Sequence, residues 1–260
     1  MITVDWVGAL SAERSAMLAF CERLSADDWA AASAAVGWTV QDVVAHIASG
    51  CHAIFSPAVV KVLRSKDIET TNDIFVDEWR DCSPKYVLDE YRRWSRRVAI
   101  AARIIRCTPM RSLPLPLAEL GYFSSTLLLC GAMTFDHHTH LRHDMAPVLN
   151  QSAPATNANR MTVVLAWMFA VLRNQLKRVD LFWLDRPLGI TLKGPVGGSW
   201  IADRQDIEPA RGRVCDTWIE AHAIEFPEWA TCRADWRGRD VSIHGDETYC
   251  AAFLDFMNVV

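Results

Sequence analysis

Residues 37–46, Gly-Trp-Thr-Val-Gln-Asp-Val-Val-Ala-His, and residues 135–144, Phe-Asp-His-His-Thr-His-Leu-Arg-His-Asp, decide the fold of this chain. Each stretch is typical of a helix that directs imidazole or carboxylate groups toward one spot. Because an α-helix repeats every ~3.6 residues, Asp136 and His140 lie on one face of their helix. His46 on a facing helix would complete a metal site of two histidines and one carboxylate. Alternatively, the histidine-rich segment is a polar helix end that faces water.

The helical period dominates the first part of the chain, up to about residue 147. Thr39 and Asp42 are spaced as a capping box whose acid is one methylene shorter than usual. The proline-rich residues 113–117 are expected to be a connection. Four long amphipathic helices predict an antiparallel four-helix bundle over residues 1–149. We expect these helices over about 4–24, from Thr39 to near Pro57, from Ser83-Pro84 to about Cys107, and over about 124–145.

The second part of the chain predicts a smaller α+β domain over residues 160–260. Residues 150–159 are small and polar, which is the composition of a linker. A turn at 194–198, rich in glycine, is expected to join two neighbouring strands. We expect helices over about 160–178 and 246–257, and strands at 181–184, 189–193, 199–202, 214–222 and 241–243.

Composition narrows the classes of function. The chain has 260 residues, 51% of them hydrophobic, which suffices for the cores of two domains. Its 27 basic and 31 acidic residues give a net charge of −4 and no basic stripe, so nucleic acid is not expected as a partner. No signal peptide or apolar run of ~18 residues occurs, so we expect a cytoplasmic protein without a membrane partner. Eight cysteines without any C-x-x-C spacing are expected to be free thiols.

The first motif resembles a known family. Residues 38–46 are similar to the opening of the second helix in the mycothiol-dependent maleylpyruvate isomerase family, within the DinB-like superfamily. Asp136-x-x-x-His140 is similar to the acid-x-x-x-His pattern of the fourth helix in that family. The family usually carries Glu at the first of these positions, and Asp144 follows one place later than the usual spacing.

The C-terminal sequence also resembles this family. Residues 226–233, 245–247 and 253–255 resemble its sterol-carrier-like second domain, with Cys232 at a position where glycine is frequent. The resemblance is nearly end to end, and all of the stretches occur in the family's order. It implies a DinB-like four-helix bundle followed by a sterol-carrier-like α+β domain.

The resemblance also implies an activity. A divalent metal, zinc foremost, would be held by His46, Asp136 and His140, with mycothiol or a similar low-molecular-weight thiol as cosubstrate. The enzyme would carry out isomerisation or S-transfer on a small electrophilic substrate that is carboxylated. The same ligands also suit non-haem iron(II) or nickel. The alternative is a metal-free small-molecule-binding protein with the same two-domain fold. The identity of the substrate, of the thiol and of the retained metal, and the oligomeric state, are not determined by the sequence.

The ligand set itself indicates chemistry. Two imidazoles and one carboxylate leave a coordination position open, as catalysis requires. A thiol bound there loses its proton and becomes a nucleophile at neutral pH. Addition of the thiolate to an activated C=C bond, followed by rotation and expulsion, would give cis–trans isomerisation.

Several other polar residues have two interpretations. His143 and Asp144 either fix the tautomer of His140 or are solvated residues at a helix end. Arg233 is expected to contact an anionic thiol or substrate, and its alternative is an interdomain ion pair. The remaining candidates are His137 and His138, expected to point elsewhere; Arg92, Arg93, Arg96 and Arg97, a carboxylate clamp or a solvated helix face; and Cys130, near the site or buried filler.

Overall fold

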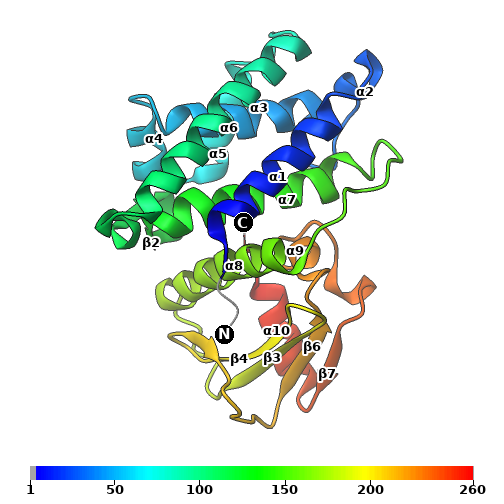
Figure 1. Ribbon diagram of the computed structural model, residues 1–260. Helices are drawn as coiled ribbons and strands as arrows, with labels where there is room; N and C mark the ends of the chain where they lie inside the picture. The colour runs from blue at the N-terminus through cyan, green and yellow to red at the C-terminus, as the bar shows by residue number, and fades with distance from the viewer. Residues whose placement is uncertain (1–3, 260) are drawn as a thin grey trace. The chain divides into compact units, whose positions relative to one another are not determined.

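The computed structural model describes residues 4–259 (Figure 1). The chain forms two compact units, one that extends to Val163 and one that begins at Val164. The first unit is helical and the second contains a five-stranded sheet, which confirms the predicted fold class. Among the described residues, no helix combines the length and apolar character needed to cross a membrane.

Four long helical segments build the first unit. They are α1 (Trp6–Cys21), α3 (Val40–Ala53), α6 (Pro84–Arg106), and a last helix made of the π-helical segment η3 (Leu127–Ala132), α7 (Met133–Thr139) and the π-helical segment η4 (His140–Met145). Helix α3 packs against α6, and α1 packs against both α6 and α7. Their buried faces share one core, whose members include Met17, Phe20, Val43, Val44, Ile47, Tyr91 and Leu141.

Helix α3 begins at the expected capping box. The Thr39 hydroxyl accepts a hydrogen bond from the Asp42 N–H at 3.1 Å. The Asp42 carboxylate accepts one from the Thr39 N–H at 2.8 Å. This start sets the rotation of the helix, so that Val43 and Ile47 are buried and His46 lies at the edge of the buried stripe.

Shorter elements connect the long helices. Residues 113–117 connect α6 to the last helix, as expected, and within this connection β1 (Pro114–Leu117) pairs antiparallel with β2 (Gly121–Ser124). A two-stranded ribbon has only edge strands, where prolines are tolerated. The other short elements are α2 (Ala26–Ala30), α4 (Val59–Arg64), α5 (Ile68–Asp77), and the 3₁₀ helices η1 (Pro109–Ser112) and η2 (Ala118–Leu120).

The sheet of the second unit has the order β5-β4-β3-β6-β7. Strand β3 pairs parallel with β6, and the other neighbours pair antiparallel. The strands are β3 (Leu188–Lys193), β4 (Gly198–Ala202), β5 (Ile207–Pro209), β6 (Trp218–His222) and β7 (Ser242–His244). The helices are α8 (Ala158–Arg178), within which the two units divide, α9 (Phe226–Trp229), the 3₁₀ helix η5 (Trp236–Gly238) and α10 (Glu247–Phe256).

Two expectations for these strands were wrong, and one strand was missed. Residues 181–184 form a turn, in which the Leu184 N–H donates to the Leu181 carbonyl at 2.9 Å. Both leucines are buried, so their spacing of three reflects a turn and not a strand. Strand β6 begins only at Trp218, and β5 was not expected at all. The turn between β3 and β4 is present, with the Gly197 N–H donating to the Gly194 carbonyl.

Candidate metal centre

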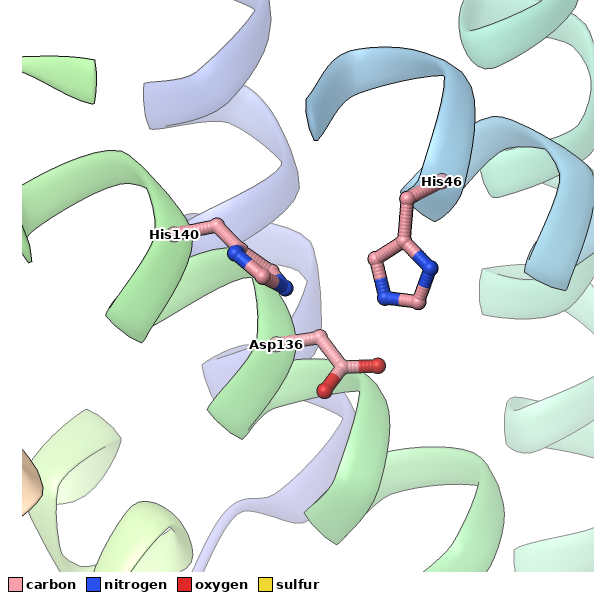
Figure 2. Close-up of side chains that lie close together, drawn as sticks. All are labelled: His46, Asp136 and His140. Carbon is pink, nitrogen blue, oxygen red and sulfur yellow. The ribbon is translucent and has the colours of Figure 1, made fainter. Parts of the chain in front are cut away.

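His46, Asp136 and His140 lie together in the first unit (Figure 2). One donor atom from each residue lies within 4.8 Å of the donor atoms of the other two. Two ligands that share an ion at about 2.0–2.2 Å are at most about 4.4 Å apart, so small side-chain movements would bring all three onto one ion. The centroids of the two imidazole rings are 5.1 Å apart in an edge-to-face arrangement.

The supporting helices determine this convergence. His46 comes from α3, Asp136 from α7, and His140 from the first position of η4, which contacts α3. Asp136 and His140 are one turn apart and therefore share a face. His140 is buried, whereas the other two side chains are half-buried and remain accessible to a small ligand.

Asp144 orients His140. Its carboxylate is fully buried and lies 2.6 Å from Nδ1 of His140. A carboxylate can only accept a hydrogen bond, so Nδ1 carries the proton and Nε2 keeps its lone pair. Of the two interpretations of Asp144, the buried partner of His140 is the one that the structure supports. This arrangement is common around metal-binding histidines.

Trp38 lies beside both histidines. Its indole ring is 5.1 Å from the ring of His46 and 6.4 Å from the ring of His140, measured between centroids. The indole N–H donates to the Asp73 carboxylate on α5 at 2.9 Å, which fixes the ring. The sequence motif contained Trp38, but residue spacing alone gave it no role.

His137 and His138 do not belong to this group of ligands. Both side chains are buried, and Nδ1 of His137 donates to the Met133 carbonyl at 2.6 Å. Burial lowers the pKa of His137 to about 4, despite that hydrogen bond. Burial likewise lowers the pKa of His138, and the ring of His137 is neutral at pH 7. The pair supports the helix that carries the candidate ligands.

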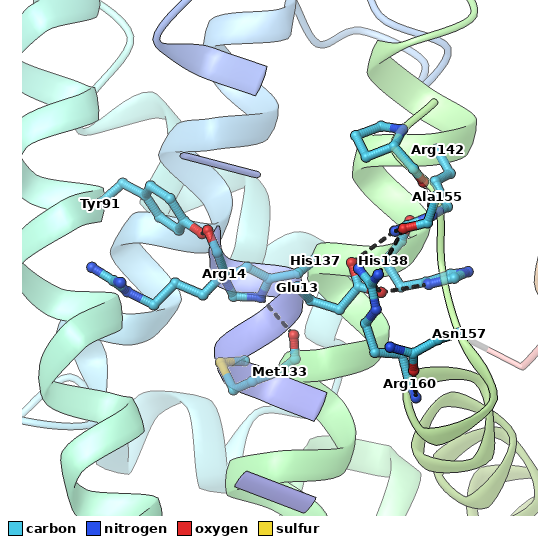
Figure 3. A network of polar contacts seen from close by, with 11 residues as sticks. Glu13, Arg14, Tyr91, Met133, His137, His138, Arg142, Ala155, Asn157 and Arg160 are labelled. Carbon is cyan, nitrogen blue, oxygen red and sulfur yellow. Dashed lines mark hydrogen bonds and ion pairs between the residues drawn. The ribbon is translucent and has the colours of Figure 1, made fainter. Parts of the chain in front are cut away.

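Glu13 of α1 is a buried acid that contacts the last helix of the first unit, which carries His138 and Arg142 (Figure 3). It accepts from His138 at 2.9 Å and from Arg142 at 2.7 Å, and Arg160 lies 3.6 Å away. Burial raises the pKa of Glu13, but the interactions with His138 and Arg142 outweigh it and leave that pKa below its ordinary value. The sequence signal was a charged residue in an apolar stripe, between Leu10 and Met17.

The arginine group on α6 is mostly a solvated helix face. Arg92 pairs with Glu22 and Asp89, and Arg93 pairs with Glu90. The guanidinium of Arg97 lies 4.3 Å from the ring centroid of Trp94. Arg96 takes part in none of these pairs and lines a hollow between helices.

Two further candidates are not among the three grouped residues. Cys130 is fully buried, and burial raises the pKa of its thiol to about 11. Both observations agree with a protonated cysteine that packs in the core. Arg233 follows α9 in the second unit, where its side chain is half-buried and its backbone N–H donates to the Glu228 carbonyl at 3.0 Å.

Residues 10–105 match the family model described as "Mycothiol maleylpyruvate isomerase N-terminal domain". This segment includes His46 and ends before Asp136. No curated protein matches the chain at a significant level. The crystal structure of a mycothiol-dependent maleylpyruvate isomerase is similar, with 13% identity, a TM-score of 0.56, and coverage of 92% of this chain and 91% of that one. A mutant of that enzyme aligns with 12% identity, a TM-score of 0.56, and coverage of 91% of each chain. At these identities the structural likeness establishes the fold.

Proposed function

From the membership of this chain in the mycothiol maleylpyruvate isomerase family, through its N-terminal domain, we propose that it is an enzyme that uses a low-molecular-weight thiol. Its reaction is isomerisation of, or S-transfer to, a small carboxylated electrophile. Its centre is a divalent metal, zinc foremost, held by His46, Asp136 and His140. The observation that carries this proposal is the convergence of those three donors beside a buried second carboxylate.

The residues fit a divalent ion by their chemistry. Two neutral imidazole nitrogens and one carboxylate oxygen are ligands that zinc accepts. Asp144 accepts the hydrogen bond from Nδ1–H of His140. The proton is therefore on Nδ1, and the lone pair of Nε2 is available to the ion. Asp136 replaces the glutamate that is usual at this position in the family. The separation of at most 4.8 Å between donor atoms supports the shorter acid as a ligand.

When bound, the ion supplies a cationic centre that holds a thiol as its thiolate at neutral pH. The chain's own residues prepare the place for it. His46, His140 and Asp136 would hold the ion, and this set of three ligands would leave room for a thiol sulfur. The Trp38 indole excludes water from one side of the histidines, and its hydrogen bond to Asp73 keeps it there.

The thiolate then adds to one carbon of a C=C bond conjugated to a carbonyl, and the π electrons move onto that carbonyl. The former double bond is now single and rotates. Return of the electrons expels the thiolate and leaves the geometric isomer, so no atom is gained or lost. The thiol would therefore be recovered after each turnover.

Metal analysis of the purified protein tests the centre, and calorimetric titration with mycothiol tests the thiol. We expect about one divalent ion per chain and mycothiol binding that is lost when a chelator removes the ion. Mycothiol binding of equal strength without the ion would instead support a metal-free binding protein.

Replacing Asp144 by asparagine should weaken metal binding by about 10–100-fold, because the neutral amide no longer holds His140 with a charged acceptor. The affinity is measured by competition with a chromophoric chelator. Asp89→Asn on the surface of α6 is the control and should leave the affinity unchanged. Equal metal affinities of the Asp144 variant and the natural chain would show that Asp144 does not contribute to metal binding.

Replacing Arg233 by lysine should weaken thiol or substrate binding by about tenfold and leave metal content unchanged, because lysine keeps the charge but loses the planar fork. Titration with mycothiol, initial rates and metal analysis measure the three quantities. Arg237→Lys, whose side chain pairs with Asp255, serves as the control. A pure loss of thermal stability, with unchanged binding, would make Arg233 a structural residue.

A further inference from the structure

Helices α1 and α6 lie side by side (Figure 1) and enclose a hollow on the surface of the first unit. Its volume is about 430 Å³. Three lining residues come from α1 and four from α6: Ser11, Arg14 and Ser15, and Arg96, Ala99, Ile100 and Arg103. None of them belongs to the candidate metal centre.

The sequence explains the hollow. Positions 96, 99, 100 and 103 share one face of α6, and positions 11, 14 and 15 share one face of α1. Packed helices usually fill such a seam with large apolar side chains. Here Ser11, Ser15 and Ala99 are small, so the space between the helices stays open, and long arginine side chains border it.

The charge in the hollow is of one sign. No carboxylate lines it, and among the described residues neither Arg96 nor Arg103 has an acidic partner. By contrast, Arg92 and Arg93 on the same helix are paired with acids. Arg14 is held in place, because its Nε donates to Ser95 Oγ at 2.8 Å and one Nη donates to the Arg92 carbonyl at 3.0 Å.

We propose that this hollow binds a small linear dicarboxylate. Arg96 and Arg103 are two helical turns apart, about 10.5 Å along the axis, and each guanidinium can take one carboxylate through two parallel hydrogen bonds. Ala99 and Ile100 lie between them and suit an apolar chain that joins the two acid groups. Arg14 and the Ser11 hydroxyl supply further donors from the opposite wall, whereas the Ser15 hydroxyl donates to the Ser11 carbonyl at 2.8 Å.

Calorimetric titration with suberate, an eight-carbon dicarboxylate, tests the proposal on the full chain. We expect one saturable site per chain, with octanoate, the monoanion of equal length, at least tenfold weaker. Arg96→Gln and Arg103→Gln should each weaken suberate binding by about tenfold or more. Arg64→Gln removes an exposed arginine on α4 and is the control that should bind as the natural chain does.

Three results would overturn the proposal. The first is the absence of saturable suberate binding. The second is an equal loss in Arg64→Gln, which would indicate unspecific charge. The third is binding of octanoate or inorganic phosphate as strong as that of suberate, which would show that two spaced carboxylates are not recognised. Circular dichroism and metal content confirm that each variant is folded and keeps its centre.

Discussion

Replacing His46 or His140 by alanine should remove bound metal and activity together while the fold persists. Loss of a residue that supports a metal ligand already costs about 10–100-fold in affinity, so loss of a ligand itself should cost more than about 100-fold. The fold should persist because the core around Val43, Val44 and Ile47 does not depend on either ring. Metal analysis, turnover and thermal unfolding measure the three properties.

His52→Ala is the matched control for His46→Ala. His52 lies on the same helix and is also half-buried, but its ring packs 4.5 Å from that of Trp94, apart from the three ligands. This variant should retain its metal. Full turnover by a metal-free His140→Ala protein would show that the cluster is structural, and the search for a reaction centre would then move elsewhere.

Replacing Glu13 by glutamine should lower the free energy of unfolding by about 3–5 kcal/mol. The substitution leaves the buried guanidinium of Arg142, whose side chain is 7% exposed, without a counter-charge. Chemical denaturation measures the change. Glu22→Gln, at the C-cap of the same helix, is the control, because its pair with Arg92 is exposed and should be worth no more than about 1 kcal/mol. Equal effects of the two substitutions would contradict the prediction.

The same pair of proteins gives a pH test. The pKa of Glu13 lies below its ordinary value of 4.5 in the folded chain, so the ionised acid stabilises the fold above that pH. The contribution disappears as the pH falls through the folded-state pKa. The difference in unfolding free energy between the natural chain and Glu13→Gln should therefore be full near pH 7 and shrink below 4.5.

Local signals predicted the helices well. The Thr39–Asp42 capping box fixed the start of α3, and Ser83 caps α6 as its place before a proline indicated. The strands were harder to predict from the sequence, because the spacing of Leu181 and Leu184 fits a short strand and a turn equally well. Only the hydrogen bond between them, and the absence of a partner strand there among the described residues, distinguishes the two.

The candidate ligand positions followed from helical spacing, but their surroundings did not. His46, Asp136 and His140 were predicted from the sequence motif and the helical period, whereas Glu13 and Trp38 owe their contacts to packing between distant segments.

The backbone conformation at Cys232 was also not predictable from the sequence. Its φ of 58° lies in the left-handed region, which explains why glycine suits this position in the family, and a single sequence carries no record of that angle.

The contacts of the chain before α8 bear on how this protein can be divided. Arg142 donates to the Pro154 carbonyl at 3.1 Å, and Arg160 donates to the Ala155 carbonyl at 2.7 Å while also approaching Glu13. A fragment that ended at residue 149 would keep the acid and lose one of its bases and both carbonyl acceptors. Exchange of the helical unit between relatives would therefore preserve its charge balance only if the transplanted piece continued through Val163.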